Sequence, residues 1–178
     1  MRPSRVFRWI VRAFLLVFTL SLSAVSLLGG WSAVTILNPS SDDINIPDGP
    51  IGYNINIGNS SVQITIPFNI SNGGVYELSN VELGLQFDMR FENVTAGNAT
   101  TTFTVFNAIH YYGNILPGAT LKANLTGFGT FPLSDVNTDR NPDLDLFIGL
   151  LFSASYSLNL YTFTVGIVNV SIGTYDIP

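Results

Sequence analysis

The residues best suited to chemistry form one acidic run in the last third of the chain. Its oxygen-bearing side chains recur at about every second position: Asp135, Asn137, Asp139, Asp143 and Asp145. Hard Ca²⁺ binds six to eight such oxygens from a compact segment, so the run resembles the first half of a calcium loop. The match is partial, because Arg140 stands where an EF-hand needs glycine and Leu146 where it needs a bidentate glutamate. The run therefore predicts either a calcium site or a solvated acidic loop that caps a following helix.

Other catalytic groups are scarce. The chain has one histidine, His110, and no cysteine, which excludes zinc sites built from these ligands and a Cys–His nucleophile pair. No Gly-x-Ser-x-Gly motif is present to supply the serine of a triad around His110. The glutamates Glu77, Glu82 and Glu92 have no spacing that distinguishes a glycosidase pair from solvated charges. We expect no enzyme activity and no cofactor other than calcium, and a structural role for His110.

The N-terminal region carries the clearest signal in the sequence. Four arginines lie within residues 1–12, and no charged residue follows until position 42. Trp9 and Trp31 are separated by roughly 33 Å of helix, close to the thickness of a bilayer's hydrocarbon core. Tryptophan favours both membrane interfaces, and arginines favour the cytoplasmic side. These features predict a cytoplasmic basic segment (1–12), a transmembrane helix (13–34) that contacts the lipid bilayer, and a linker (35–43).

A cleaved signal peptide is the alternative for this region. Small residues at Ala24-Val25-Ser26 have the spacing that signal peptidase prefers. Leu27 and Leu28 extend the apolar run past that point, which favours a retained anchor. Both the anchor and the signal peptide predict that the rest of the chain lies outside the cell.

The remaining residues, 44–178, are enough for one domain with a packed core. Beyond position 12 the chain has twelve acidic residues against three basic ones, a net charge of −9. Such a surface repels a phosphate backbone, which argues against nucleic-acid binding. The absence of cysteine excludes a disulfide-stabilised scaffold, so the domain must rely on packing.

Alternation of apolar and polar residues predicts β-strands through most of this domain. The predicted strands cover residues 51–57, 62–70, 81–91, 100–111, 119–127, 155–165 and 166–173. Pro67 lacks a backbone donor and predicts an edge position or a bulge in its strand. Asn72-Gly73-Gly74 predicts a turn between two strands. The exception is the region 141–152, where Asn141-Pro142-Asp143 predicts the cap of a short helix. The pattern predicts an all-β antiparallel sandwich with one short helix.

Six Asn-x-Ser/Thr sequons lie beyond the predicted membrane segment, on the side that the topology makes external. They begin at Asn59, Asn69, Asn93, Asn98, Asn124 and Asn169. We expect glycosylation at some of them. Asn93 and Asn98 are favoured because they share one predicted loop, whereas the use of Asn69 depends on its side chain facing water.

From residue 44 onward the chain resembles the LEA14-like, or water-stress and hypersensitive-response (WHy), domains, and more closely their membrane-anchored archaeal relatives. The resemblance is carried by residues 64–81, an apolar strand with a central proline, an Asn-Gly turn and an aromatic residue. A second match is the acidic segment 143–152 followed by residues 156–160. The resemblance implies an immunoglobulin-like sandwich with one short helix, and it implies no catalytic residues.

These observations predict a single-pass membrane protein with a cytoplasmic N-terminus and an extracellular, glycosylated β-sandwich. Its role would be structural, envelope-associated or binding, with envelope components or further copies of the chain as partners. The alternative is a secreted subunit of a surface filament or sheath, with the N-terminal segment cleaved and sandwiches joined by strand exchange.

Overall fold

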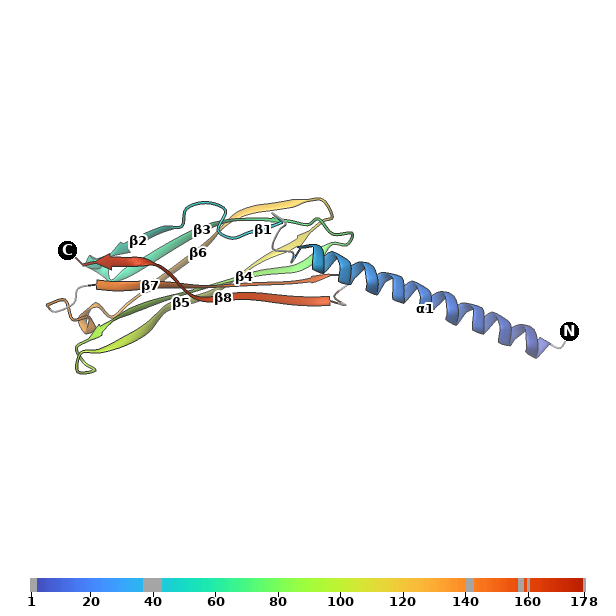
Figure 1. Ribbon diagram of the computed structural model, residues 1–178, viewed down its shortest axis with the longest axis horizontal. Coiled ribbons are helices and arrows are strands. Elements are labelled where there is room, and N and C mark those ends of the chain that lie inside the picture. The colour runs from blue at the N-terminus through green and yellow to red at the C-terminus, as the bar shows by residue number, and fades with distance from the viewer. Residues whose placement is uncertain (1–2, 37–42, 140–142, 157–158, 160, 178) are drawn as a thin grey trace.

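The computed structural model describes residues 3–36, 43–139, 143–156, 159 and 161–177. A long N-terminal helix leads into two antiparallel sheets that pack face to face, and the helix projects from one end of this β-sandwich (Figure 1). The helices and strands are α1 (Pro3–Ile36), β1 (Ile44–Asn45), β2 (Gly52–Asn56), η1 (Ile57–Asn59), β3 (Ser61–Ser71), β4 (Leu78–Asn93), β5 (Ala99–Ile115), β6 (Thr120–Thr130), η2 (Leu133–Asp135), β7 (Asp143–Tyr156) and β8 (Tyr161–Asp176).

Helix α1 contains the predicted membrane segment. Within it, the 21 residues Val11–Trp31 have a mean hydropathy of 2.1, so this part is long and apolar enough to cross a membrane. A signal sequence near the N-terminus meets the same criterion. The helix runs to Ile36, two residues into the predicted linker, and the rest of that linker up to residue 42 lies outside the described residues.

The first sheet has β3 at its centre, with β6 on one side and both β1 and β2 on the other. Pro67 lies in this central strand rather than at an edge, and it pairs with Asn124 of β6. On its other side β1 pairs with residues 69–70 and β2 with residues 61–65, so Pro67 faces the gap between them. Its carbonyl accepts a bond from the Asp48 amide in that gap, at 2.7 Å. A missing donor is tolerated there because no ladder bond requires it.

The second sheet has the strand order β5-β4-β7-β8. Strand β4 confirms the predicted alternation: Val81, Leu83, Leu85, Phe87 and Met89 are fully or almost fully buried on one face. These side chains meet Val62, Ile64, Ile66, Phe68 and Ile70 of β3 in a single core between the sheets. The predicted all-β sandwich is therefore correct at the level of its two layers.

The predicted short helix over 141–152 is wrong where the structure describes it, because residues 143–156 form strand β7. Leu144, Leu146 and Ile148 are buried in the core, whereas Phe147 and Leu151 lie on the opposite face. Apolar residues on both faces hide the period of two: on the outer face the Phe147 ring lies under the Arg90 guanidinium, and Leu151 remains 40% exposed. Residues 141 and 142 of the predicted cap lie outside the described part.

The boundary between the last two predicted strands is also wrong. Residues 155 and 156 end β7, the chain turns near Asn159, and one continuous strand, β8, then runs from Tyr161 to Asp176. Gly166, which was expected to begin a new strand, lies within β8 opposite Leu151. Asn159 has a φ of 66°, the left-handed conformation that asparagine tolerates at turns.

The two sheets approach most closely along β5 and β6. A Cβ on Gly127 would overlap the Phe106 ring, and a Cβ on Gly129 would lie 2.5 Å from the Val105 carbonyl oxygen. His110 Nε2 donates to the Thr126 carbonyl at 2.8 Å, so a β5 side chain satisfies a β6 backbone group. Glycine is needed here because any side chain would hold the sheets apart.

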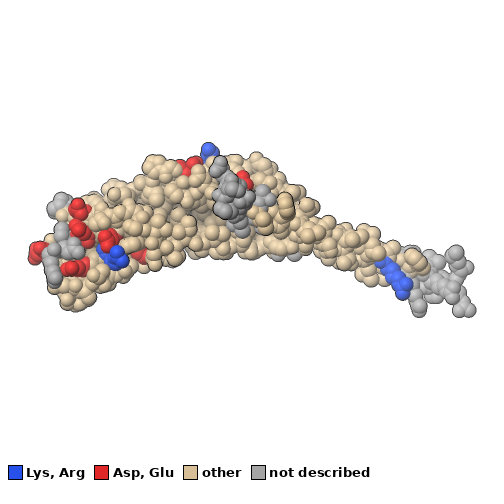
Figure 2. Space-filling view, viewed as in Figure 1, with Lys and Arg blue, Asp and Glu red and all other residues tan. Residues whose placement is uncertain are grey.

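The sandwich has two distinct ends. At the end from which α1 projects, here called the proximal end, β3 leads to β4, β5 to β6 and β7 to β8 (Figure 1). At the opposite end, here called the distal end, β2 leads to β3, β4 to β5 and β6 to β7. Figure 2 shows acidic side chains gathered at the distal end, and basic side chains both on the sandwich and on the N-terminal part of the helix.

Candidate functional sites at the two ends of the sandwich

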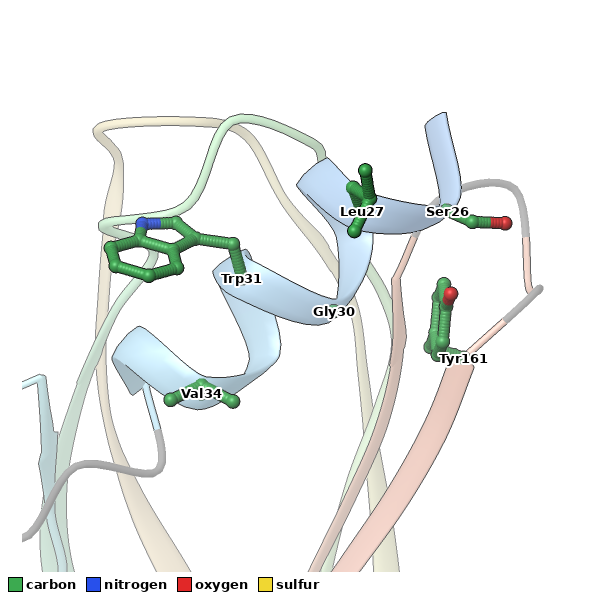
Figure 3. A pocket seen from close by; sticks show the side chains of 6 residues that line it. All are labelled: Ser26, Leu27, Gly30, Trp31, Val34 and Tyr161. Carbon is green, nitrogen blue, oxygen red and sulfur yellow. The ribbon is translucent and has the colours of Figure 1, made fainter. Parts of the chain in front are cut away.

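The proximal end holds an apolar groove between α1 and the start of β8 (Figure 3). The groove has a volume of about 370 Å³. Its lining residues are Ser26, Leu27, Gly30, Trp31, Val34 and Tyr161. Gly29 of the helix is buried where the helix contacts β7 and β8, whereas a Cβ on Gly30 would meet nothing within 4 Å.

A buried asparagine joins the loops of the proximal end. Asn72 is 1% exposed, and its Nδ2 donates to the carbonyls of Tyr76 at 2.9 Å and Ile115 at 2.8 Å. Its Oδ1 accepts from the Gly74 amide at 3.0 Å and the Tyr156 hydroxyl at 2.7 Å. The side chain thus satisfies groups from three chain segments, which fixes the β3–β4 loop, the end of β5 and the end of β7 relative to one another.

The same residue also ties down the β5–β6 loop through its backbone. The Asn72 amide donates to the Ala119 carbonyl at 2.9 Å, and its carbonyl accepts from the Gly118 amide at 2.8 Å. Because Asn72 is buried and bonded to several loops, moving any one loop alone would break hydrogen bonds and cost free energy. Burial, with a smaller effect from the Asp43 charge, also raises the pKa of the Tyr156 hydroxyl far above its ordinary value.

The predicted calcium ligands lie at the distal end but on three separate parts of it. Asp135 ends the short helix η2, and Asn137 is buried and donates from Nδ2 to Asn98 Oδ1 at 2.9 Å. Asp143 and Asp145 project from the same face of β7, and Asp139 is exposed in the preceding turn. Among the described residues no three aspartate, glutamate or histidine side chains are grouped as a metal site would require.

Asp145 already has a cationic partner. The Arg90 guanidinium donates to its carboxylate at 3.0 Å and lies 4.8 Å from the centre of the Phe147 ring. Thr174 donates to the other carboxylate oxygen at 3.2 Å. Arg140, which stands at the glycine position of an EF-hand, lies outside the described residues. Calcium at this end stays a prediction, and a calorimetric titration of the full chain that shows no heat and no thermal shift would contradict it.

Two carboxyl groups face each other across the last two strands. Asp143 of β7 is paired in register with Asp176 of β8. A hydrogen bond with Asp176 is the main cause that raises the pKa of Asp143, followed by desolvation and by repulsion from Asp176 and Asp145. Asp143 also lines a polar cavity of about 330 Å³, together with Arg90, Phe91, Glu92, Thr100 and Asp145.

The six sequons occupy different surroundings. Asn59, Asn93 and Asn98 lie at the distal end, in or beside the η1 turn and the β4–β5 loop. Asn124 and Asn169 are exposed on strands β6 and β8. Asn69 lies within central strand β3, and its Oδ1 is buried without a hydrogen-bond partner. Access therefore differs most between the loop sites and Asn69, and glycosylation itself stays a prediction.

The loop sequon at Asn93 has a defined geometry. Asn93 Oδ1 accepts from the Thr95 amide at 2.8 Å and from the Thr95 hydroxyl at 2.6 Å. The Ala96 amide donates to the same oxygen at 3.1 Å. This arrangement is an Asx turn, which fixes the amide side chain on the exposed loop.

Sequence reasoning missed the groove and the role of Asn72. Asn72 was interpreted only as a turn residue, because its partners Ile115 and Tyr156 are distant in sequence. Two exposed apolar residues at the proximal end could have been noticed in the sequence. Val75 and Leu116 are apolar residues in turns that are otherwise rich in glycine and proline, and they are 57% and 61% exposed.

Comparison with known proteins adds little to this geometry. No family model matches the chain, and no curated protein matches it. Among solved structures it is similar to Spo0M, a sporulation control protein from Bacillus subtilis, with 12% sequence identity and a TM-score of 0.29. The similarity covers 67% of this chain and 47% of the other, so the chain spans about half the length of Spo0M. At this TM-score no functional argument follows from the similarity.

Proposed function

We propose that the chain is a single-pass membrane protein that displays a glycosylated β-sandwich outside the cell, with its N-terminus in the cytoplasm. The observation that carries the proposal is the apolar span Val11–Trp31, in which Arg12 is the one charged residue, within one long helix that precedes the sandwich. Arg12 lies at the N-terminal margin of the span, and cations favour the cytoplasmic side. Orientation and external location then follow from the same charge asymmetry.

The polar side chains inside the span fit a lipid environment. The Thr19 hydroxyl donates to the Leu15 carbonyl at 2.6 Å, and the Ser21 hydroxyl donates to the Val17 carbonyl at 2.9 Å. Each hydroxyl is thereby satisfied within the helix, which removes the main cost of placing it in hydrocarbon. Large apolar side chains such as Phe14, Leu16 and Leu20 are more than half exposed, so they require an apolar surrounding.

We assign the external domain a structural or binding role in the cell envelope. We also propose that it is an immunoglobulin-like member of the LEA14-like domains, of the archaeal membrane-anchored type. The two antiparallel sheets and the 64–81 motif, which spans β3 and the start of β4, support this assignment. A distal end with several carboxylates and three sequons offers a surface for contact with other molecules.

Cysteine labelling on intact cells tests the topology. The natural chain has no cysteine, so Phe128→Cys on β6 and Ser4→Cys near the N-terminus give single sites. A membrane-impermeant maleimide should label Phe128→Cys on intact cells, and should label Ser4→Cys only after the cells are opened. Labelling of Ser4→Cys on intact cells, or protection of Phe128→Cys, would contradict the orientation.

A second candidate function, a subunit of a surface filament or sheath, is favoured by the free edge of β8. This strand ends the second sheet, and between Tyr161 and Tyr175 it carries no charged residue. Val165, Ile167, Val168 and Val170 are exposed to between 41% and 77%. Long uncharged edge strands are sites where another chain can add a strand.

Charge placed on that edge distinguishes the two functions. In a filament subunit, Val168→Lys should abolish assembly. Phe128→Lys on β6, where Phe128 is 66% exposed against 77% for Val168, should leave assembly intact. A chain that acts as a single anchored protein should sediment as a monomer in detergent with or without either substitution. Filaments that survive Val168→Lys would exclude β8 as their joining edge.

A further inference from the structure

The sandwich lies beside α1 before the apolar span has ended. Val25, Ser26 and Gly30 are partly buried and Gly29 is buried, although the apolar span continues to Trp31. Tyr161, the first residue of β8, lines the groove together with this part of the helix (Figure 3). The helix therefore contacts the sandwich within the last two turns of the segment that crosses the membrane.

This overlap fixes the depth of the proximal end. Trp31 lies six positions after Val25, and at 1.5 Å per residue this distance is about 9 Å of helix. The headgroup region on each side of the hydrocarbon core is about 5–7 Å thick. When Val11–Trp31 occupies the hydrocarbon core, the start of β8 must lie at least as deep as the lipid headgroups.

The loops beside the helix present apolar tips at this level. In both ribbon views the β3–β4 and β5–β6 loops extend along α1 past its C-terminal end (Figures 1 and 3). The β3–β4 loop exposes 57% of Val75, and the β5–β6 loop exposes 61% of Leu116. Loop tips in water are normally polar, so two exposed aliphatic tips at one end of the domain favour an apolar partner.

The polar groups of the proximal end also suit lipid headgroups. Asn80, at the start of β4, donates from Nδ2 to Asn159 Oδ1 at 3.0 Å, and its amide donates to Asn114 Oδ1 at 3.2 Å. These amides are uncharged and exposed. The acidic residues nearest this end are Asp43 and Glu77, which are partly buried, whereas most carboxylates lie in the distal half (Figure 2). Contact between the proximal end and the headgroups therefore brings few carboxylate charges close to the bilayer.

The tips are held in place before any lipid arrives. Asn72 bonds to Tyr76 and Gly74 in the first loop, and to Ile115, Gly118 and Ala119 around the second. A surface fixed in this way loses little conformational freedom when it meets a partner. Val75 and Leu116 can therefore enter the interface without reorganising their loops.

We propose that the proximal end of the sandwich is a lipid-binding surface, in which Val75, Leu116 and Tyr161 enter the headgroup region of the outer leaflet beside α1. This inference rests on the membrane anchor proposed above. It adds that the domain is seated on the bilayer at a fixed depth, with its distal end directed away from the membrane, rather than carried at a distance on its linker.

Depth-dependent quenching tests the seating in the full chain. Single-cysteine variants Val75→Cys, Leu116→Cys and, as a matched exposed control, Phe128→Cys are labelled with an environment-sensitive dye and placed in phosphatidylcholine nanodiscs. Lipids spin-labelled at the headgroup should quench the dye at positions 75 and 116 several-fold more than at 128, and the dye emission there should shift to the blue. Circular dichroism confirms that each labelled chain keeps its fold.

Tryptophan quenching separates this inference from the anchor itself. Trp9→Phe leaves Trp31 as the one tryptophan, and brominated lipids should quench it when α1 lies in the bilayer. Quenching of Trp31 without quenching at positions 75 and 116 would overturn the seating while the anchor stands. Absence of Trp31 quenching would overturn the anchor and the seating together.

Discussion

The Tyr156 hydroxyl donates a 2.7 Å hydrogen bond to Asn72 Oδ1, and this bond joins two buried residues that are 84 positions apart. It connects the end of β7, next to which α1 packs, with the turn that follows β3. The remaining bonds of Asn72 extend the connection to the loop between β5 and β6. The Asn72–Tyr156 pair therefore holds the loops of the proximal end together.

Removing Asn72 should destabilise the domain strongly. Asn72→Ala leaves several buried donors and acceptors without partners, and we expect the free energy of unfolding to fall by about 3 kcal/mol or more. Tyr156→Phe removes one bond and should cost about 1–2 kcal/mol. Asn54→Ala, at an exposed position on β2, serves as the control and should have little effect.

The pair can be tested as a pair by chemical denaturation of the full chain and its variants in detergent. If the two residues act through their mutual bond, the double variant should lose less stability than the two single losses combined. Strictly additive losses would show that the Tyr156 hydroxyl stabilises the fold independently of Asn72.

Stability should fall at alkaline pH because of Tyr156. Burial, with a smaller contribution from Asp43, raises the pKa of its hydroxyl above the ordinary value of 10.0 that applies to the unfolded chain. The folded chain holds this proton more tightly, so the stabilisation is fully present below pH 10 and is lost as the pH rises above it. Denaturation midpoints between pH 8 and 11 measure the effect, and Tyr156→Phe should lose less stability over that range than the natural chain.

The close approach of the sheets at Gly127 should not tolerate a side chain. Gly127→Ala places a Cβ into the Phe106 ring, and we expect it to destabilise the domain by about 1–3 kcal/mol. Gly52→Ala is the matched control, because a Cβ there lies 3.8 Å from its nearest neighbour, an ordinary contact. Equal thermal shifts for the two variants would mean that the sheets separate without cost at β5 and β6.

The carboxyl pair at the distal end should oppose folding at neutral pH. The pKa of Asp143 is raised mainly by its hydrogen bond with Asp176, so the favourable protonated form exists at low pH and is lost as the pH rises through the raised pKa. Asp176→Asn keeps a hydrogen-bonding side chain and removes one charge. We expect it to unfold at a higher temperature than the natural chain at pH 7, with the difference disappearing below about pH 4. A lower melting temperature at pH 7 would show that the Asp176 charge stabilises the fold.

Strand β4, which sequence reasoning predicted well, has one apolar buried face and an opposite face made mostly of polar residues. Val81, Leu83 and Leu85 alternate with polar residues in β4, and the spacing alone locates this strand. Strand β7 has apolar residues on both faces, which hides the period of two, so Asn141-Pro142-Asp143 gave the stronger local signal, that of a helix cap. The cap residues favoured a helix, whereas pairing with β4 and β8 favours a strand. In the described residues 143–156 the strand is the structure that forms.

The proximal surface could be predicted only in part. Val75 and Leu116 are visible in the sequence as apolar residues within turns, but nothing local places them at the same end of the domain as Trp31. That relation depends on the strand order and on Asn72, whose partner Tyr156 is distant in the chain. Side chains that the strand order brings together show no regular spacing in the sequence. The acidic run of 135–145 has a regular spacing, but the structure does not gather its described side chains into one cluster.

The central claim is that α1 remains attached and holds the sandwich at the membrane. N-terminal sequencing of the native protein, extracted from the membrane fraction, tests it most directly. We predict a mature chain that retains the arginine-rich segment and the whole of α1. A mature N-terminus immediately after Ser26 would contradict the anchor and favour a secreted subunit.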